Sequence, residues 1–265
     1  MTEAASTPAV SAVADGPVLE VTLDRGKANA IDAATSRELS QVFAAFRDDG
    51  DLRVAILTGA GDRFFCAGWD LNAAAGGEGF EDDYGEGGFG GFGELPGLLK
   101  PVIAAVNGMA VGGGFEIVLA ADLVVAAEHA RFWLPEASLG IVPDTASVRL
   151  PRMVPPAVAN EVLYAGRRLD AAEALRWGLV NAVVGANDLM TEARALAGRI
   201  AEAAPLSVAA IHQIRDRTRQ LPPADAFELL RSGDLDAYEA MLASEDAAEG
   251  PRAFTEGRAP RWQGR

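Results

Sequence analysis

Two glutamates, Glu116 and Glu136, stand in segments whose composition suits acid–base chemistry. Glu116 ends the run AAVNGMAVGGGFE (104–116), in which a strand-like stretch leads through three glycines into the start of a helix. Glycines allow a substrate to approach the backbone, and the first turn of a helix presents free N–H groups with partial positive charge. Such groups can stabilise a carbonyl oxygen that becomes negative during a reaction. Taken alone, the run is equally consistent with a tight strand–helix junction and a favourable first-turn acid.

Glu136 lies in the run FWLPEASLGIVP (132–143), directly after Pro135. The proline restricts the backbone and so fixes the direction of the side chain that follows. Two glutamates on separate, stiff elements could act as a general acid/base pair, and in a site closed to water at least one would have a raised pKa. A third segment, FFCAGWDL (64–71), could supply a second backbone N–H for the same oxygen. By its own segment, Glu136 reads as an ordinary surface acid.

The elements that must position these residues alternate between strand-like and helical patterns, which predicts an α/β domain. Asp32 is a candidate N-cap for a helix that extends to about Phe46, with apolar residues at helical spacing. The triple glycine opens a second helix over Phe115–Ala121. The predicted strands are Val18–Leu23, Val54–Leu57, Pro101–Val106 and Leu123–Ala126.

From about Pro151 onward the pattern is mostly helical. Short helices are expected after Asp170, after Asn187 or Asp188 and after Ser207, and Ala224–Ala243 is amphipathic. Such a helical tail folds back on the core or packs against a neighbouring subunit. The expected organisation is a disordered tail over residues 1–14, a core domain over 15–205 and a C-terminal helical region over 206–265.

The chain has 265 residues and a formal charge of −15, from 38 acidic and 23 basic residues. This charge argues against a nucleic-acid partner, because cation clusters hold the phosphate backbone. No apolar run is long enough for a membrane helix, and the first residues do not read as a secretory signal. The single cysteine, Cys66, fits a cytoplasmic location. His129 and His212 are far apart in sequence, so we expect no metal site.

The segment Ala73–Gly97 is glycine-rich, acidic and aromatic, and it has no periodicity. Its length exceeds that of an ordinary connection, so we expect a mobile lid or a binding loop. A nucleotide-binding motif does not explain the triple glycine before Glu116. Neither the G-x-G-x-x-G spacing nor a Walker-type G-K-[ST] is present, which disfavours nucleotide-dependent redox or phosphoryl transfer.

Taken together, FFCAGWDL, PVIAAVNGMAVGGGFE and LPEASLGIVP resemble the enoyl-CoA hydratase/isomerase (crotonase) superfamily, in its order and at its usual separations. The resemblance extends over roughly Pro17 to Arg265. It implies a spiral of repeated strand–strand–helix units followed by a helical C-terminal region. It also implies an acyl-CoA substrate, no metal, flavin or nicotinamide cofactor, and assembly as a homotrimer or a dimer of trimers.

The resemblance assigns roles residue by residue. The backbone N–H groups of Trp69 and Gly113 would form an oxyanion hole for the thioester carbonyl, and Glu116 and Glu136 match the two catalytic glutamates. Both glutamates are present, which favours hydratase or dehydratase chemistry over double-bond isomerisation. Coenzyme A would lie along residues 27–30 and 67–71. The residues predicted to bind it are Lys27, Ala28, Ala30, Ala67, Asp70 and Leu71.

One segment departs from the family pattern. After Pro143 the family usually has a glycine pair, whereas this chain reads PDTASVRL (143–150), without glycines and one residue shorter. The segment adjoins the expected acyl pocket, so its change bears on substrate choice and on turnover. The predicted role of Lys27 in binding coenzyme A also has an alternative: Lys27 could be an ordinary surface lysine, because lysines are exposed by default.

Within the superfamily the sequence looks most similar to the members that interconvert carnitinyl-CoA and crotonobetainyl-CoA, on runs such as LDRGKANAIDAATS and GRRLDAAEALRWGLVN. The trimethylammonium of that substrate needs aromatic faces and carboxylates. The expected contributors are Phe80, Tyr84, Phe89 and Phe92, acids between Glu78 and Glu94, Trp69 and Trp133. The alternatives are a solvated flap at this segment, a short-chain enoyl-CoA hydratase, an enoyl-CoA isomerase and a non-catalytic acyl-CoA-binding subunit.

Overall fold

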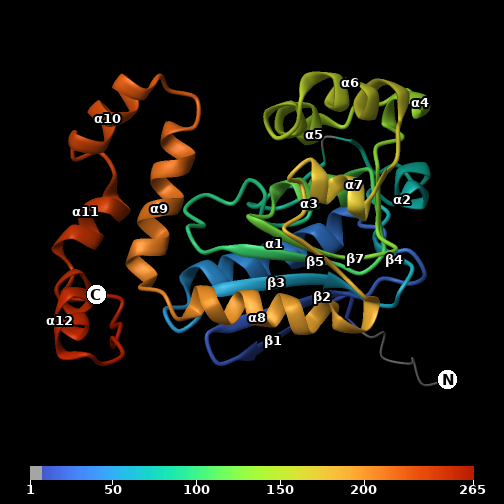
Figure 1. Cartoon of the computed structure of the whole chain (residues 1–265). Helices are drawn as coiled ribbons and strands as arrows, with labels where there is room; N and C mark the ends of the chain where they lie inside the picture. Colours follow the sequence, from blue (N-terminus) through green and yellow to red (C-terminus); the bar gives the residue numbers. More distant parts are fainter. Residues whose placement is uncertain (1–7, 81) are drawn as a thin grey trace.

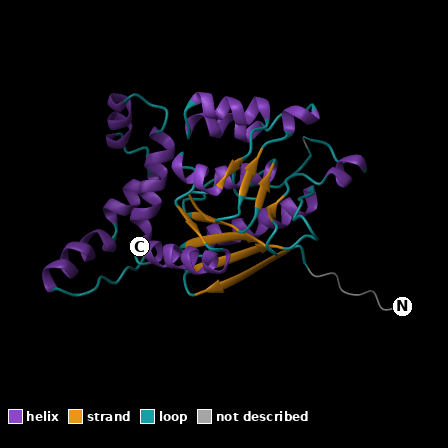
Figure 2. Cartoon of the chain, turned by 45° about the vertical axis from the view of Figure 1, so that its right-hand side comes forward, coloured by secondary structure: helices purple, strands orange, loops and turns teal. Residues whose placement is uncertain are grey.

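The computed structural model describes residues 8–80 and 82–265, and it contains two sheets (Figures 1 and 2). In the larger sheet all neighbouring strands are parallel except the first two, which form a hairpin. Its strands, in spatial order, are β1 (Val10–Asp15), β2 (Val18–Leu23), β3 (Val54–Gly59), β5 (Val102–Val106), β7 (Leu123–Ala127) and β10 (Ala182–Val184).

The smaller sheet has the order β4 (Phe64–Cys66), β6 (Met109–Val111), β8 (Arg131–Trp133) and β9 (Leu169–Asp170). Successive pairs of strands alternate between the sheets: β3, β5 and β7 enter the larger one, and β4, β6 and β8 enter the smaller one. The helices that follow these pairs are α2 (Leu71–Ala75), α3 (Gly113–Ala120) and α4 (Glu136–Leu139). This repeated strand–strand–helix unit confirms the predicted fold class.

Both faces of the larger sheet are covered, which is why its central strands are continuous apolar runs. Helix α8 (Leu189–Ala201) packs its alanines and Leu189 against Val54, Ile56 and Ile103. The alternate strand residues face the main core, where α1 (Ala33–Asp48) contributes Leu39, Phe43 and Phe46. Asp32 caps α1 by accepting the Thr35 N–H at 2.8 Å, as its sequence predicts.

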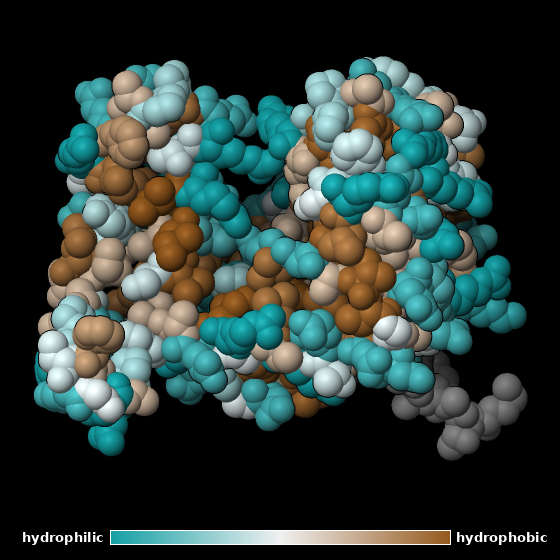
Figure 3. Space-filling view, in the orientation of Figure 1, coloured by the Kyte–Doolittle hydropathy of each residue, from teal (hydrophilic) through white to brown (hydrophobic). Residues whose placement is uncertain are grey.

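The last helices form an arm beside the sheets, drawn orange to red in Figure 1. The arm consists of α9 (Pro205–Thr218), α10 (Pro223–Arg231), α11 (Asp236–Ala243) and α12 (Glu245–Glu256). Apolar side chains gather on its visible face (Figure 3). The remaining helices are α5 (Asp144–Arg149), α6 (Pro156–Ala165) and α7 (Ala171–Arg176), with single 3₁₀ turns at Leu150–Arg152 and Ala186–Asp188.

Beyond shifts of one or two residues at element ends, the structure differs from the prediction in three places. The predicted amphipathic helix over 224–243 is two helices, α10 and α11, because the chain turns at Gly233 with φ +84°. Helix α9 begins at Pro205 after Ala204, and not after Ser207. The predicted N-terminal tail is also too long. Residues 1–7 lie outside the described part, but Val10–Asp15 pairs with β2 as strand β1 through the turn at Gly16.

No helix within residues 8–80 and 82–265 is long and apolar enough to span a membrane.

Candidate active site

A cavity of about 450 Å³ lies between the start of α3, the segment after α2, and helices α4 and α5. It brings together six of the predicted site residues, from three separate stretches of the chain. These residues are Ala67, Trp69, Leu71, Gly113, Glu116 and Glu136.

Glycines bring two backbone segments into contact at this cavity. Gly112, with φ +56°, caps α3 and accepts the N–H groups of Phe115 and Glu116. A side-chain carbon on Gly68 would lie 2.7 Å from the Val111 carbonyl oxygen and 2.8 Å from the Gly113 nitrogen. The segments can therefore approach only because glycine has no Cβ atom. This contact places the residue after Gly68 beside the start of α3.

The backbone N–H groups of Trp69 and Gly113 are both free to bind an oxygen. Trp69 forms a parallel bridge with Ile31, in which the Ile31 N–H donates to the Gly68 carbonyl at 2.8 Å. The N–H of Trp69 therefore points away from Ile31, to the side on which β6 pairs with β4. Gly113 is the first residue of α3, where N–H groups have no acceptor in the helix. Neither N–H makes a hydrogen bond within the described residues.

Glu116 is held by the helix that the unusual segment 143–150 forms. Its Oε1 accepts the N–H of Ala146, in the first turn of α5, at 2.8 Å. Burial raises the pKa of Glu116 and the negative charge of Asp144 adds to this, while the hydrogen bonds from Ala146 and Thr145 act in the opposite direction. The missing glycines are thus replaced by a short helix whose free N–H orients this carboxylate. No local sequence pattern links Ala146 to Glu116, so the sequence alone does not predict this role.

Glu136 is 7% exposed and its Oε2 has no hydrogen-bond partner within the described residues. Its Oε1 lies against Gly112, where an added Cβ would be only 2.6 Å away. Burial raises the pKa of Glu136 to about 7, and the negative charges of Glu116 and Asp144 contribute. An unsatisfied buried carboxyl is costly, so its retention points to a functional role.

The remaining residues predicted to bind coenzyme A lie outside the cavity lining. Asp70 caps α2 and pairs with Arg25 at 2.6 Å, so its carboxylate has a structural partner. The carbonyl of Ala28 accepts the Ala67 N–H at 3.0 Å. The Ala30 carbonyl accepts a hydrogen bond from Arg25, and Lys27 is exposed. Arg25, which also pairs with Asp32, holds these segments together, and sequence reasoning missed it.

The segment 73–97 divides into residues that face the cavity and residues that do not. Phe80, Tyr84 and Phe89 line the cavity as predicted. Phe92 does not, because it is buried in the core with its ring centroid 4.8 Å from that of Phe43. Trp133 was also wrongly predicted: it lines a separate hollow, beneath the guanidinium of Arg168 at 4.0 Å.

Two further acids of this segment hold it in place. Glu78 accepts the indole N–H of Trp69 at 2.7 Å and the N–H of Ala33 at 3.0 Å, so it links the segment to α1. Glu86 pairs with Arg47 at 3.1 Å. Glu81 lies outside the described residues. Among the described residues no three histidine, cysteine or acidic side chains are placed to hold a metal ion.

Comparison with known proteins gives a consistent result. A sequence profile described as Enoyl-CoA hydratase/isomerase matches residues 14–265. The carnitinyl-CoA dehydratase of Proteus mirabilis is 59% identical over 251 residues, which cover 94% of this chain and 96% of the relative. The carnitinyl-CoA dehydratase of Citrobacter koseri is 58% identical over the same shares. The crystal structure of an enoyl-CoA hydratase from Mycobacterium tuberculosis superposes with a TM-score of 0.89 at 40% identity, over 98% of this chain and all of that one.

Proposed function

Because the chain belongs to the enoyl-CoA hydratase/isomerase family, we propose that it is a hydro-lyase that interconverts carnitinyl-CoA and crotonobetainyl-CoA with release or uptake of water. Relatives named carnitinyl-CoA dehydratase are 56–59% identical over 94–95% of this chain. The observation that carries the chemistry is that half-buried Glu116 and buried Glu136 line one cavity, both with a raised pKa, beside two unused backbone N–H groups.

In the dehydration direction the pair begins with one proton, on Glu116. The thioester carbonyl accepts hydrogen bonds from the N–H groups of Trp69 and Gly113, which stabilise the negative charge that develops on its oxygen. Glu136 as carboxylate removes the α-proton. Glu116 then donates its proton to the β-hydroxyl group, which leaves as water as the double bond forms. Hydration is the reverse, so Glu116 activates the water and Glu136 supplies the α-proton.

The electrostatics of the cavity suit this exchange. Burial raises the pKa of both carboxyls, and the negative charge of Glu116 further raises the pKa of Glu136. Burial therefore favours the protonated form of each carboxyl, and repulsion between the two charges disfavours the state in which both are ionised. The Ala146 N–H keeps Glu116 in one orientation during the transfer.

The coenzyme is part of the substrate, and we propose that the enzyme needs no other cofactor. The thioester end of coenzyme A would lie against Ala67 and Leu71 at the cavity. Lys27, which is exposed after strand β2, would bind the phosphates. Ala28, Ala30 and Asp70 would contribute backbone atoms, since the Asp70 carboxylate is engaged by Arg25. Lys27→Ala should raise KM and leave kcat unchanged.

We also propose that the protein is cytoplasmic and forms homotrimers or dimers of trimers through its helical arm. The support is a set of exposed apolar side chains on the arm: Ile211, Leu221, Phe227, Leu242 and Phe254. Such side chains on one region are typical of subunit contacts. Sedimentation of the full chain tests the oligomeric state.

The decisive experiment measures hydration of crotonobetainyl-CoA and crotonyl-CoA by the wild type, Glu116→Gln and Glu136→Gln. Each glutamine variant should lose roughly 10²–10⁴-fold in kcat, because acid–base catalysis contributes about that much. Glu128→Gln is the control, since Glu128 is exposed and outside the cavity. Full activity in both catalytic variants would refute the mechanism.

A second candidate is a short-chain enoyl-CoA hydratase with the same catalytic pair. The solved structures with the same fold support it, since one named enoyl-CoA hydratase is 40% identical. A wild type that hydrates crotonyl-CoA much faster than crotonobetainyl-CoA would establish this second function. The reverse preference would support the first.

A further inference from the structure

The charge of the cavity wall is unusual. Among the described residues that line it there is no lysine, arginine or histidine. The wall carries six carboxylates: Asp82, Asp83, Glu94, Glu116, Glu136 and Asp144. Adjacent like charges destabilise one another, so this wall disfavours an anionic acyl group and favours a cationic one. Only two of the six carboxylates are needed for the proposed chemistry.

Asp144 and Glu94 are the carboxylates best placed to meet a cation. Within the described residues the Asp144 carboxylate accepts only the N–H of Thr145, at 2.6 Å, and its charge raises the pKa of both Glu116 and Glu136, so it lies within electrostatic reach of the pair. The Glu94 carboxylate lines the cavity, and within the described residues it accepts no hydrogen bond and forms no ion pair, whereas its backbone N–H donates to the Gly87 carbonyl. Arg149 interacts with it electrostatically but donates its hydrogen bond to the Gly93 carbonyl.

Aromatic rings complete the same part of the cavity. The Phe89 ring lies against the α-carbon of Gly113, where an added Cβ would be 2.4 Å from the ring. Tyr84 meets Phe89 edge-to-face with ring centroids 5.4 Å apart. Phe80 meets Trp69 in the same manner at 5.5 Å. The aromatic surface therefore starts directly beside one of the two free N–H groups.

We propose that Asp144, Glu94, Tyr84 and Phe89 form a subsite for the quaternary ammonium group of the acyl chain. This inference rests on the proposed function, whose substrate carries its nitrogen two bonds beyond the β-carbon. With the carbonyl at Gly113 and the β-carbon at Glu116, the nitrogen falls in the same cavity. A trimethylammonium has no N–H to donate, so ring faces and nearby unpaired carboxylates recognise it by charge alone.

The chemistry of the wall separates this ligand from other cations. A divalent metal needs several oxygens converging at about 2.0–2.6 Å. No group of three acids among the described residues is so placed. Asp82 and Asp83 already accept backbone N–H groups at the exposed rim, at 2.5 and 2.9 Å, so outside the catalytic pair a primary ammonium would have only the Asp144 and Glu94 carboxylates of the described wall as acceptors. A quaternary ammonium, whose charge is covered by methyl groups, fits the rings of Trp69, Phe80, Tyr84 and Phe89 better than a metal ion or a primary ammonium does.

The test compares the binding of two saturated, unreactive thioesters of equal shape, so that turnover is not required. They are 4-(trimethylammonio)butanoyl-CoA and its uncharged carbon isostere, 5,5-dimethylhexanoyl-CoA. The wild type should bind the cationic ester about tenfold more tightly or better, as expected for a partly desolvated cation on aromatic faces beside carboxylates. The preference should fall several-fold in Asp144→Asn and in Glu94→Gln, and nearly vanish in the double variant.

Glu86→Gln is the matched control, because Glu86 belongs to the same segment but faces Arg47. It should retain the full preference. Equal affinity of the wild type for the two esters would overturn the subsite, as would an unchanged preference in the double variant. A wild type that prefers the cationic ester but hydrates no enoyl-CoA would instead refute the proposed function and leave the subsite standing.

Discussion

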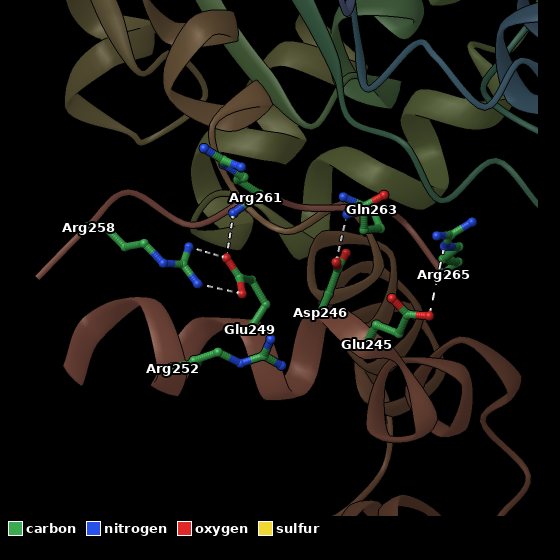
Figure 4. A pocket seen from close by; sticks show the side chains of 8 residues that line it. All are labelled: Glu245, Asp246, Glu249, Arg252, Arg258, Arg261, Gln263 and Arg265. Carbon is green, nitrogen blue, oxygen red and sulfur yellow. Dashed lines mark hydrogen bonds and ion pairs between the residues drawn. The ribbon is translucent and has the colours of Figure 1, made fainter. Parts of the chain in front are cut away.

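Two hollows of the molecule are lined with carboxylates. In one of them the carboxylate oxygens have hydrogen-bond partners, and in the other a buried carboxylate oxygen has none within the described part of the chain. In the hollow at the end of the arm, Glu249 accepts two hydrogen bonds from Arg258, at 2.6 and 3.0 Å, and one from the Arg261 N–H (Figure 4). Asp246 accepts the backbone N–H groups of Gln263 and Gly264. In the active-site cavity, by contrast, the Glu136 Oε2 has no partner among the described residues.

The difference appears in the acidity of the two groups. Hydrogen bonds from Arg258, with its charge, lower the pKa of Glu249 to about 2. Burial and neighbouring negative charge raise the pKa of Glu136 to about 7. A carboxylate with satisfied oxygens stabilises the fold and cannot take a proton near neutral pH. A buried carboxyl with an oxygen that has no partner costs stability but can exchange a proton with a substrate, which is typical of functional sites.

Among the changes that contrast the two hollows, the largest expected effect on activity comes from substituting Gly113 in the active-site cavity, and Gly257 in the arm serves as the comparison. Gly113→Ala would place a Cβ 2.4 Å from the Phe89 ring and so displace the N–H that we assign to the oxyanion hole. We expect kcat to fall by about 10²-fold, the usual result of losing one such donor. Gly257→Ala, at the end of α12 with φ +64° and open space, should cost about 1 kcal/mol of stability and no activity.

Steady-state kinetics and thermal melts of both glycine variants provide the measurement. Normal kcat in Gly113→Ala would show that this N–H does not contact the reacting oxygen. Lost activity in Gly257→Ala would show that the arm participates in the chemistry, which would remove the contrast between the two hollows.

The pH dependence should show the next largest effect. In the hydration direction Glu136 supplies the α-proton, so kcat/KM for hydration should fall as pH rises through about 7, where Glu136 loses its proton. Asp144→Asn removes a negative charge that raises the pKa of both glutamates, and the alkaline limb should move to lower pH. Glu249→Gln, in the other hollow, should leave the limb in place. An unmoved limb in Asp144→Asn would place Asp144 outside electrostatic reach of the pair.

Local patterns predicted much of the frame of this site. The strand Val18–Leu23 and the cap at Asp32 match the structure, because alternation and capping depend on neighbours in sequence. The segments of Glu116 and Glu136 do meet at one cavity. Their meeting follows from strands β6 and β8 pairing side by side, in the parallel order that the strand–strand–helix rhythm favours.

The details that tune the site depend on contacts between distant residues. The Ala146 N–H reaches Glu116 across 30 residues, and Arg25 reaches Asp70 across 45. Within the segment 73–97, Phe89 and Phe92 are three residues apart, yet one lines the cavity and the other enters the core. A segment without periodicity contains no signal for which ring faces inward, so the error at Phe92 could not have been avoided.

The smallest effect, on stability alone, should come from Arg258→Gln in the arm. This change removes both hydrogen bonds from the guanidinium to Glu249 and should lower the melting temperature by a few degrees at neutral pH. Because the pKa of Glu249 is depressed in the folded state, its stabilising contribution is complete above the ordinary value of 4.5. It is lost as pH falls toward about 2.

The variant and the wild type should therefore differ in stability above about pH 5 and converge in acid. Arg252→Gln is the matched control, since Arg252 lies on α12 together with Glu249 but acts on it only through its charge, so its effect should be smaller. Melting curves from acid to neutral pH, with kcat measured in parallel, decide the outcome. A stability difference that persists at low pH would mean that Arg258 acts through packing, and the satisfied carboxylates of the arm would then not be the counterpart of those in the cavity.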